Sequence, residues 1–169
     1  VTREKFYKSG GKGNKVNGFE AEVSGEILNG WNMTAGYTYT HSANGEQQRT
    51  NENQPLNMLR VSTAYRLPGE WQALTVGGAV NWQSRIFRDS NRPIGRDAEG
   101  EFITENAKIH QGAYTVVKLM SRYAIDKNLS ASLNVDNLFD KKYYENVGFY
   151  NGVYWGDPRT VTVSLDWKL

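Results

Sequence analysis

Few residues of this sequence belong to types that could carry out metal or nucleophilic chemistry. Cysteine is absent from the 169 residues, which excludes disulfides, thiolate metal sites and cysteine nucleophiles. His41 and His110 are the only histidines, and no carboxylate stands at a spacing that would complete a metal site with either of them. The sequence therefore predicts no catalytic residue, no resident metal and no covalently bound cofactor, and we do not expect an enzyme.

Two other clusters resemble ligand-binding loops only in part. The glycine-rich run at 9–13 lacks the spacing of a phosphate-binding loop, so we interpret it as a connection between strands. Asp97, Glu99 and Glu101 could hold a hard cation, but they lack the order of ligands found in a calcium loop. Lys and Arg number 20 against 18 Asp and Glu, with no long run of one sign, so nucleic acid is not indicated as a partner.

The composition is compatible with a membrane protein that crosses the bilayer with strands. No run of about eighteen apolar residues occurs, so the sequence predicts no transmembrane helix. A low mean hydropathy does not exclude a membrane, because a barrel strand shows only one of its two faces to lipid. Residues 1–8 are charged and lack the apolar core of a signal peptide, so we expect this chain to be part of a longer exported protein.

Apolar and polar residues alternate through most of the sequence, which is the pattern of strands with one apolar face. We expect the fourth strand to carry this pattern as far as Ile86, on the apolar face. Most strands are about 10 to 15 residues long, enough to cross a bilayer at a tilt. The alternation predicts about eight strands, at 3–7, 18–28, 31–40, 55–66, 74–86, 117–123, 129–136 and 160–169.

The connections between these strands differ strictly in length. Short turns lie around Asn29, Gly69 and Lys127. Long polar loops lie at 41–54, at 88–111 and before Pro158. Short turns on one side and long loops on the other are typical of outer-membrane barrels, whereas a soluble β-sandwich has no general reason to place all its long loops at one end.

Aromatic residues on the apolar faces gather at two heights along the strands. Four lie near the short turns or the C-terminal end: Trp31, Tyr65, Tyr123 and Trp167. Tyr39 and Trp82 lie about eight to ten residues away along their strands, which corresponds to the second of two interfacial girdles. The alternative, aromatic residues that fill the core of a sandwich, does not explain this clustering by height.

The C-terminal segment 134–169 resembles the closing region of TonB-dependent siderophore receptors. Their N-L-F-D-[KR]-x-Y segment corresponds to 137–143, and their Y/W-G-D-P-R loop corresponds to 155–159. The segments 18–22 and 36–39 are also similar to that family, so the resemblance covers nearly the whole chain. The sequences at 148–150 and 156–159 look most like the branch that binds hydroxamate-containing ferric siderophores, the coprogen and pyoverdine receptors.

The resemblance implies a fold, a location and partners. The fold class is all-β, an antiparallel transmembrane β-barrel segment comprising about the last eight strands of a 22-stranded barrel, with residues 1–169 as its C-terminal part and the plug domain outside this chain. The implied location is the bacterial outer membrane, with long loops extracellular and short turns and C-terminus periplasmic. The implied activity is TonB-dependent uptake of a ferric siderophore, with ferric iron carried in the transported complex and TonB bound through the missing N-terminal part. Outer-membrane lipid and lipopolysaccharide would surround the barrel.

The resemblance also directs attention to the long loops as the place where ligand binds. A ferric hydroxamate complex is held by aromatic faces and by donors to its oxygens, as Arg and Tyr side chains supply. The candidate ligand-binding residues lie in two of these loops: Arg88, Arg92, Arg96, Tyr150, Tyr154 and Trp155. For each of them, plain solvation of a loop is the alternative.

Charged residues also fall on the polar faces of the expected strands, which would line the lumen. They are Glu20, Glu22, Glu26, Arg60, Arg66, Arg85, Lys118 and Arg122. Hydration and ion pairing with the plug would account for them, and direct contact with the substrate is the alternative.

Two other functions remain as alternatives. A small closed outer-membrane barrel with a structural or adhesion role would share the strand pattern, although the C-terminal motifs argue against it. A soluble sugar-binding sandwich disagrees with the strand lengths and the girdles. The family usually ends in an aromatic residue, whereas Leu169 ends this sequence, so either the terminus lies further on or Trp167 and Leu169 suffice as apolar anchors.

Overall fold

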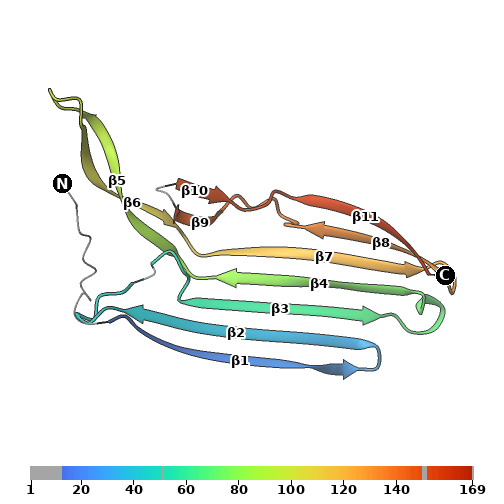
Figure 1. Ribbon diagram of the computed structural model, residues 1–169. Coiled ribbons are helices and arrows are strands. Elements are labelled where there is room, and N and C mark those ends of the chain that lie inside the picture. Colours follow the sequence, from blue (N-terminus) through green and yellow to red (C-terminus); the bar gives the residue numbers. More distant parts are fainter. Residues whose placement is uncertain (1–12, 51, 150–151, 169) are drawn as a thin grey trace, which may run out of the picture.

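The computed structural model describes residues 13–50, 52–149 and 152–168, and their main element is one antiparallel sheet. Seven strands form this sheet in the order β1-β2-β3-β4-β7-β8-β11 (Figure 1). The strands are β1 (Lys15–Leu28), β2 (Trp31–Ala43), β3 (Asn57–Arg66), β4 (Leu74–Gln83), β7 (Tyr114–Ala124), β8 (Leu129–Asp136) and β11 (Thr160–Trp167). A single 3-10 turn, η1 (Gly69–Trp71), lies between β3 and β4.

Two further antiparallel hairpins lie where the sequence predicts only long loops. One pairs β5 (Ile86–Arg96) with β6 (Phe102–Gln111), and the other pairs β9 (Tyr144–Phe149) with β10 (Gly152–Trp155). Figure 1 shows β5 and β6 projecting well beyond the end of the large sheet, with β9 and β10 near their base. No described residue belongs to a helix with the length and apolarity needed to span a membrane.

The predicted strands are confirmed where the structure describes them. The predicted end of the fourth strand is wrong, and two segments predicted to be loops contain hairpins. The strand at 3–7 lies outside the described residues. The fourth strand ends at Gln83 rather than Ile86, and Ile86 is buried at the start of β5 instead of lying on the apolar face of β4. The expected loop at 88–111 is a β-hairpin, and the expected last loop contains a second one.

The strand register places the predicted apolar residues on one face of the sheet. Directly paired residues of neighbouring strands lie on the same face, so a row of pairs identifies it. One row joins five strands through apolar side chains: Val23, Ala35, Val61, Val80 and Val117. The adjacent row, on the opposite face, holds polar or small residues and the lysine predicted to be lumenal: Ser24, Thr34, Ser62, Ala79 and Lys118.

The register also fixes the heights of the aromatic residues. Trp31 pairs with Tyr65, with ring centroids 6.0 Å apart, next to the short turns. Tyr39 lies eight positions further along β2, which corresponds to about 27 Å of extended chain. This separation is close to the roughly 25 Å height of the apolar band of outer-membrane barrels.

The short connections all lie at one end of the sheet, where β11 also ends (Figure 1). In the first of them Gly30 has φ +77°, a conformation that glycine adopts without strain. In the third, Asp126 Oδ1 accepts hydrogen bonds from the backbone N–H groups of Asn128 and Leu129, at 2.7 and 2.9 Å. These local interactions reverse the chain without needing other contacts.

The large sheet is open. Strands β1 and β11 are its two edges, and the described residues contain no pairing between them. The unpaired backbone groups of an edge strand cannot be left in hydrocarbon, since lipid offers no hydrogen-bonding partner. Both edges therefore require further strands within a membrane.

Candidate functional site

The described candidate ligand-binding residues, all except Tyr150, lie at the end of the sheet opposite the short turns. We call this part the rim: the hairpin 86–111, the paired strands 144–149 and 152–155, and the first residues of β7, 114–116. Its position follows from the topology, because β5–β6 connects β4 to β7 and β9–β10 connects β8 to β11 at that end (Figure 1). Tyr150 lies outside the described residues, so its candidate role stays a prediction.

The three candidate arginines do not share one face of the β5–β6 hairpin. Arg88 pairs with Ile109 and Arg92 pairs with Glu105, so both lie on one face. A register shift between Pro93 and Gly95 inserts an extra residue, and Arg96 then pairs with Phe102 on the opposite face. Regular alternation in the sequence would have placed all three together, and the bulge separates Arg96 from the others.

Each of these arginines already has a neighbour in the chain. Arg92 forms an ion pair with Glu105 across the hairpin. Arg96 donates a hydrogen bond to the Gly100 carbonyl at 2.6 Å, and its guanidinium lies 4.0 Å from the ring centroid of Phe102. Arg88 extends over Gly148 of β9, so it is the arginine that links the two hairpins.

Tyr154 and Trp155 lie at the end of β10 with exposed fractions of 52% and 61%. The ring of Trp155 lies 4.4 Å from that of Tyr144 on the paired strand β9. The structure therefore offers aromatic surface at the base of the projecting hairpin, where Arg88 of β5 packs against Gly148 of β9. Arg92 and Arg96 lie further out along β5.

The rim contains the apolar core of the described chain. Ile86 is 1% exposed and Val147 is 0% exposed, and β5 contacts β9 at this place. Tyr114 and Val116, at the start of β7, are the other buried apolar residues among those described. The backbone N–H of Tyr144 also donates to Gln111 Oε1 at 2.8 Å, which ties β9 to the end of β6.

The two C-terminal motifs meet in a hydrogen-bonded cluster, which we call the clasp: Asn137, Asp140, Lys141, Asp157 and Arg159. Asn137 is 2% exposed and has φ +49°. Its Nδ2 donates to the carbonyls of Lys141 and Asp157, at 2.9 and 2.8 Å, and its Oδ1 accepts from the Lys141 N–H at 2.9 Å. Asp140 Oδ1 accepts from the Arg159 N–H at 3.1 Å.

Tyr143 completes the contact between the two motifs. Its ring stacks on Tyr114 with centroids 4.3 Å apart, and a Cβ added to Gly156 would overlap this ring, so only glycine fits there. Burial, together with the negative charges of Glu145 and Asp157, raises the pKa of Tyr143 above its usual value. These motif residues therefore hold the ends of β8 and β11 together, a structural role that their spacing alone did not indicate.

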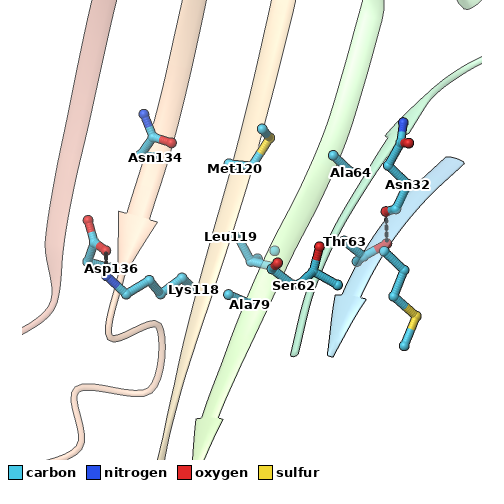
Figure 2. Close-up of a pocket in the computed structure, with 13 residues that line it drawn as sticks. Asn32, Ser62, Thr63, Ala64, Ala79, Lys118, Leu119, Met120, Asn134 and Asp136 are labelled. Carbon is cyan, nitrogen blue, oxygen red and sulfur yellow. Dashed lines mark hydrogen bonds and ion pairs between the residues drawn. The ribbon is translucent and has the colours of Figure 1, made fainter. Parts of the chain in front are cut away.

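The polar face of the sheet carries most of the charges that were predicted to be lumenal. Lys118 Nζ lies 2.6 Å from Asp136 Oδ1 beside a hollow of about 450 Å³ (Figure 2). Figure 2 also shows Met120 and Asn134 on the same face, on β7 and β8. Glu20, Glu22 and Arg60 line another hollow, of about 300 Å³. The charged and polar groups that line these hollows require water or a polar partner.

A third hollow lies where the polar face meets the rim, and the sequence had not indicated it. Tyr114, Tyr143 and Gln83 are among its lining residues, together with Arg60 and Lys118. Within the described residues, Gln83 Nε2 is buried and lacks a hydrogen-bond acceptor. Of the residues that line this hollow, Tyr143 is the one that the sequence marks, because it belongs to the first C-terminal motif.

The structure gives Asp97 a local role. Its Oδ1 accepts hydrogen bonds from the backbone N–H groups of Glu99 and Glu101, at 3.1 and 2.8 Å, in the turn between β5 and β6. Among the residues that the structure describes, no three His, Asp or Glu side chains converge as a metal site.

Comparison with known proteins identifies the family to which this architecture corresponds. Residues 3–138 match the family described as TonB dependent receptor-like, beta-barrel. The ferric-pyoverdine 358 receptor of Pseudomonas putida is 40% identical over 153 residues, which cover 90% of this chain and 17% of that receptor. The ferripyoverdine receptor of Pseudomonas aeruginosa is 39% identical over 154 residues, covering 90% and 18%.

A solved structure agrees with these sequence relatives. The crystal structure of the ferripyoverdine receptor of the outer membrane of Pseudomonas aeruginosa, bound to ferripyoverdine, is similar with a TM-score of 0.81 and 37% identity. The similarity covers 91% of this chain and 19% of that one. This chain thus spans less than a fifth of the length of these relatives.

Proposed function

The chain belongs to the TonB-dependent receptor family of outer-membrane β-barrels, and we propose that it forms the C-terminal part of a receptor that imports a ferric siderophore of the pyoverdine type. The observation that carries this proposal is the 37% identity and TM-score of 0.81 to a receptor solved with ferripyoverdine bound. The relatives at 40% and 39% identity are also pyoverdine receptors by name. The C-terminal motifs resemble the receptor branch for hydroxamate-containing siderophores, and the pyoverdine receptors belong to that branch.

The open sheet supports the proposal that residues 1–169 are one part of a larger barrel. Strands β1 and β11 would pair with strands from the rest of the protein, and the plug would come from a segment outside this chain. The same feature disfavours a small closed barrel with a structural role, because these seven strands do not close on themselves.

We further propose the orientation of the chain in the membrane. The apolar face lies against lipid, and the polar face with Lys118 and Asp136 lies toward the lumen and the plug. The short turns lie in the periplasm and the rim lies at the extracellular surface. A ferric complex captured at the rim would then enter the lumen when TonB, driven by the inner-membrane proton gradient, displaces the plug.

The ligand would meet the rim through arginine donors and aromatic surfaces. Arg88 and Arg92 lie on one face of the β5–β6 hairpin, and Tyr154 and Trp155 lie exposed on β10. Guanidinium groups donate to the oxygens of a siderophore, and exposed rings pack on its planar parts. Tyr150 and Arg96 remain candidates, and the separate position of Arg96 makes it the least favoured of the arginines.

Uptake of radioactive iron by the full-length receptor tests the proposal. The receptor would be expressed in a bacterium that lacks its own pyoverdine receptors, in matched strains with and without TonB. We expect uptake of ⁵⁵Fe-pyoverdine only with both receptor and TonB, and no uptake of a ferric catecholate supplied as the control. A correctly assembled receptor that neither binds nor imports ferric pyoverdine would contradict the proposed ligand, and uptake without TonB would contradict the mechanism.

A further inference from the structure

The β5–β6 hairpin is a long arm that contacts the rest of the described chain near its base. Its strands have 11 and 10 residues, and it pairs with no strand of the large sheet among the residues described. A two-stranded hairpin by itself is marginally stable in water, so its direction depends on the contacts at its base. These contacts include strand β9 of the neighbouring hairpin.

Gly148 is the position where this contact leaves no room for a side chain. A Cβ built there would lie 2.7 Å from Cγ and 2.8 Å from Cβ of Arg88, and closer still to Cδ. Gly148 also has φ +81°, which favours glycine independently of the contact. The stem of Arg88 therefore packs directly on the backbone of β9.

The contact lies next to the buried core of the rim. Val147, beside Gly148 in the chain, is fully buried, and so is Ile86, two residues before Arg88. The Tyr144 N–H, which donates to Gln111 Oε1 at 2.8 Å, ties β6 to the same strand. Both strands of the arm are thus fixed to β9, β5 through Arg88 and β6 through Gln111.

The face of β5 that turns toward β9 at Arg88 also carries Arg92. Four residues of extended strand correspond to about 13 Å, so a tilt of about 10° at the base would move Arg92 by ~2 Å. A hydrogen bond tolerates only a few tenths of an ångström before it weakens. The base contact therefore controls whether residues on the arm can act together with residues on β10.

We propose that Arg88 and Gly148 form a latch that joins the β5–β6 and β9–β10 hairpins into one rigid body and so positions the ligand-binding residues of both. Gly148 acts as a positioning residue, since the absence of its side chain lets the arm seat on β9. The expected effect of this latch on ligand binding rests on the proposed function. The rigidity itself does not depend on the ligand.

Spin-label distances in the full-length receptor test the rigidity. This chain has no cysteine, so Asn91→Cys on β5 and Val153→Cys on β10 place labels on the two hairpins without using candidate ligand residues. Any cysteine elsewhere in the protein would first be replaced by serine. We expect one narrow distance distribution in the unsubstituted background and a broad or shifted one in Gly148→Ala.

Gly100→Ala is the matched control for backbone strain. Gly100 has φ +87°, close to that of Gly148, but nothing lies within 4 Å of a Cβ added there. Its distance distribution should stay narrow. Adding Arg88→Ala to Gly148→Ala removes Cγ and Cδ from the overlap but also removes the side chain of the latch, so the double variant should stay as broad as Arg88→Ala alone. An unchanged distribution in Gly148→Ala, or equal broadening in Gly100→Ala, would overturn the latch.

Two further measurements keep the inference testable. If Gly148→Ala does not assemble, Arg88→Ala alone should still broaden the distribution, and a narrow one would contradict the latch. With ferric pyoverdine as probe, Gly148→Ala should raise the dissociation rate about tenfold and change the association rate less than about twofold, because affinity differences within one interface reside mostly in dissociation. If the distances behave as expected but the unsubstituted receptor binds no ferric pyoverdine, the proposed ligand fails and the latch stands.

Discussion

Val147 at the rim is fully buried, at 0% exposed, whereas Val163 in the middle of β11 is 71% exposed. Ile86 and Leu165 show the same contrast, at 1% and 70%. Burial of such a side chain contributes about 1.5–3 kcal/mol, so the rim obtains this stabilisation from its own chain and the sheet does not. The sheet must obtain it from lipid on the apolar face.

Hydrogen bonding does not follow this contrast throughout. The clasp satisfies all three side-chain bonds of Asn137 within the chain. On the polar face, by comparison, Gln83 Nε2 is buried without an acceptor among the described residues, at the border between sheet and rim. In the rim, Asn146 Oδ1 on β9 is likewise buried without a donor among the described residues, so neither region satisfies all of its own polar groups.

The largest expected effect is a charge placed on the apolar face of the sheet. Val163→Arg should lower the free energy of unfolding of the full-length receptor in lipid vesicles by about 2–4 kcal/mol, the cost of an arginine at the bilayer midplane. Thr162→Arg, one residue away on the polar face, is the control and should have a much smaller effect. Equal losses in the two variants would remove the distinction between the faces.

The second prediction concerns the clasp. Asn137→Ala removes three hydrogen bonds at a buried residue, so it should lower stability by about 3 kcal/mol, at roughly 1 kcal/mol for each bond. Asn137→Asp keeps the acceptor for the Lys141 N–H but sets a buried carboxylate oxygen against the carbonyls of Lys141 and Asp157, so it should lose at least as much. Limited proteolysis of 138–158 in the assembled receptor would report the loosened segment, and an unchanged cleavage rate in Asn137→Ala would contradict the clasp.

The third prediction addresses ligand binding at the rim. Replacing Tyr150, Tyr154 and Trp155 together by Ala should weaken ferric-pyoverdine binding by more than about tenfold, roughly 1.4 kcal/mol. Membrane assembly should remain normal, because Tyr154 and Trp155 are exposed on β10 rather than part of the buried core. Equilibrium binding to the purified receptor measures the effect. Unchanged affinity in the folded triple variant would assign these residues to loop packing.

The smallest effect is expected for the ion pair on the projecting arm. Arg92 and Glu105 both have exposed side chains, at 68% and 44%, so solvent screens their attraction. Arg92→Ala should therefore change the free energy of unfolding by less than about 0.5 kcal/mol. Denaturant titration checks this value. A loss above about 1 kcal/mol would mean that the arm contributes to stability as the buried core does.

The same contrast explains what the sequence could predict. Each strand of the large sheet faces two different environments, so alternation is imposed on its sequence and the faces of residues such as Val61 and Arg60 follow directly. The seven described strands and the heights of Trp31 and Tyr39 were therefore accessible. So was the family, because the C-terminal motifs are specific.

The hairpins of the rim were missed because no such constraint acts on them. Both faces of the β5–β6 arm lie outside the bilayer, so its strands need no apolar alternation, and the bulge at Pro93 and Gly95 breaks the pattern further. Burial of Ile86 against the rest of the rim depends on contacts distant in sequence. The roles of Gly148 and Asn137 likewise depend on neighbours that spacing alone does not reveal.

The central claim is that the apolar face of this sheet lies in lipid, and β11 tests it most directly. Single cysteines at residues 161–167 of the full-length receptor in a bilayer would carry spin labels, with oxygen and a water-soluble nickel complex as relaxation agents. We predict that labels at Val161, Val163 and Leu165 are accessible to oxygen and protected from nickel. Labels at Thr162, Ser164 and Asp166 should lack this combination of high oxygen accessibility and protection from nickel. An accessibility profile without this alternation, or with Asp166 on the lipid side, would contradict the account.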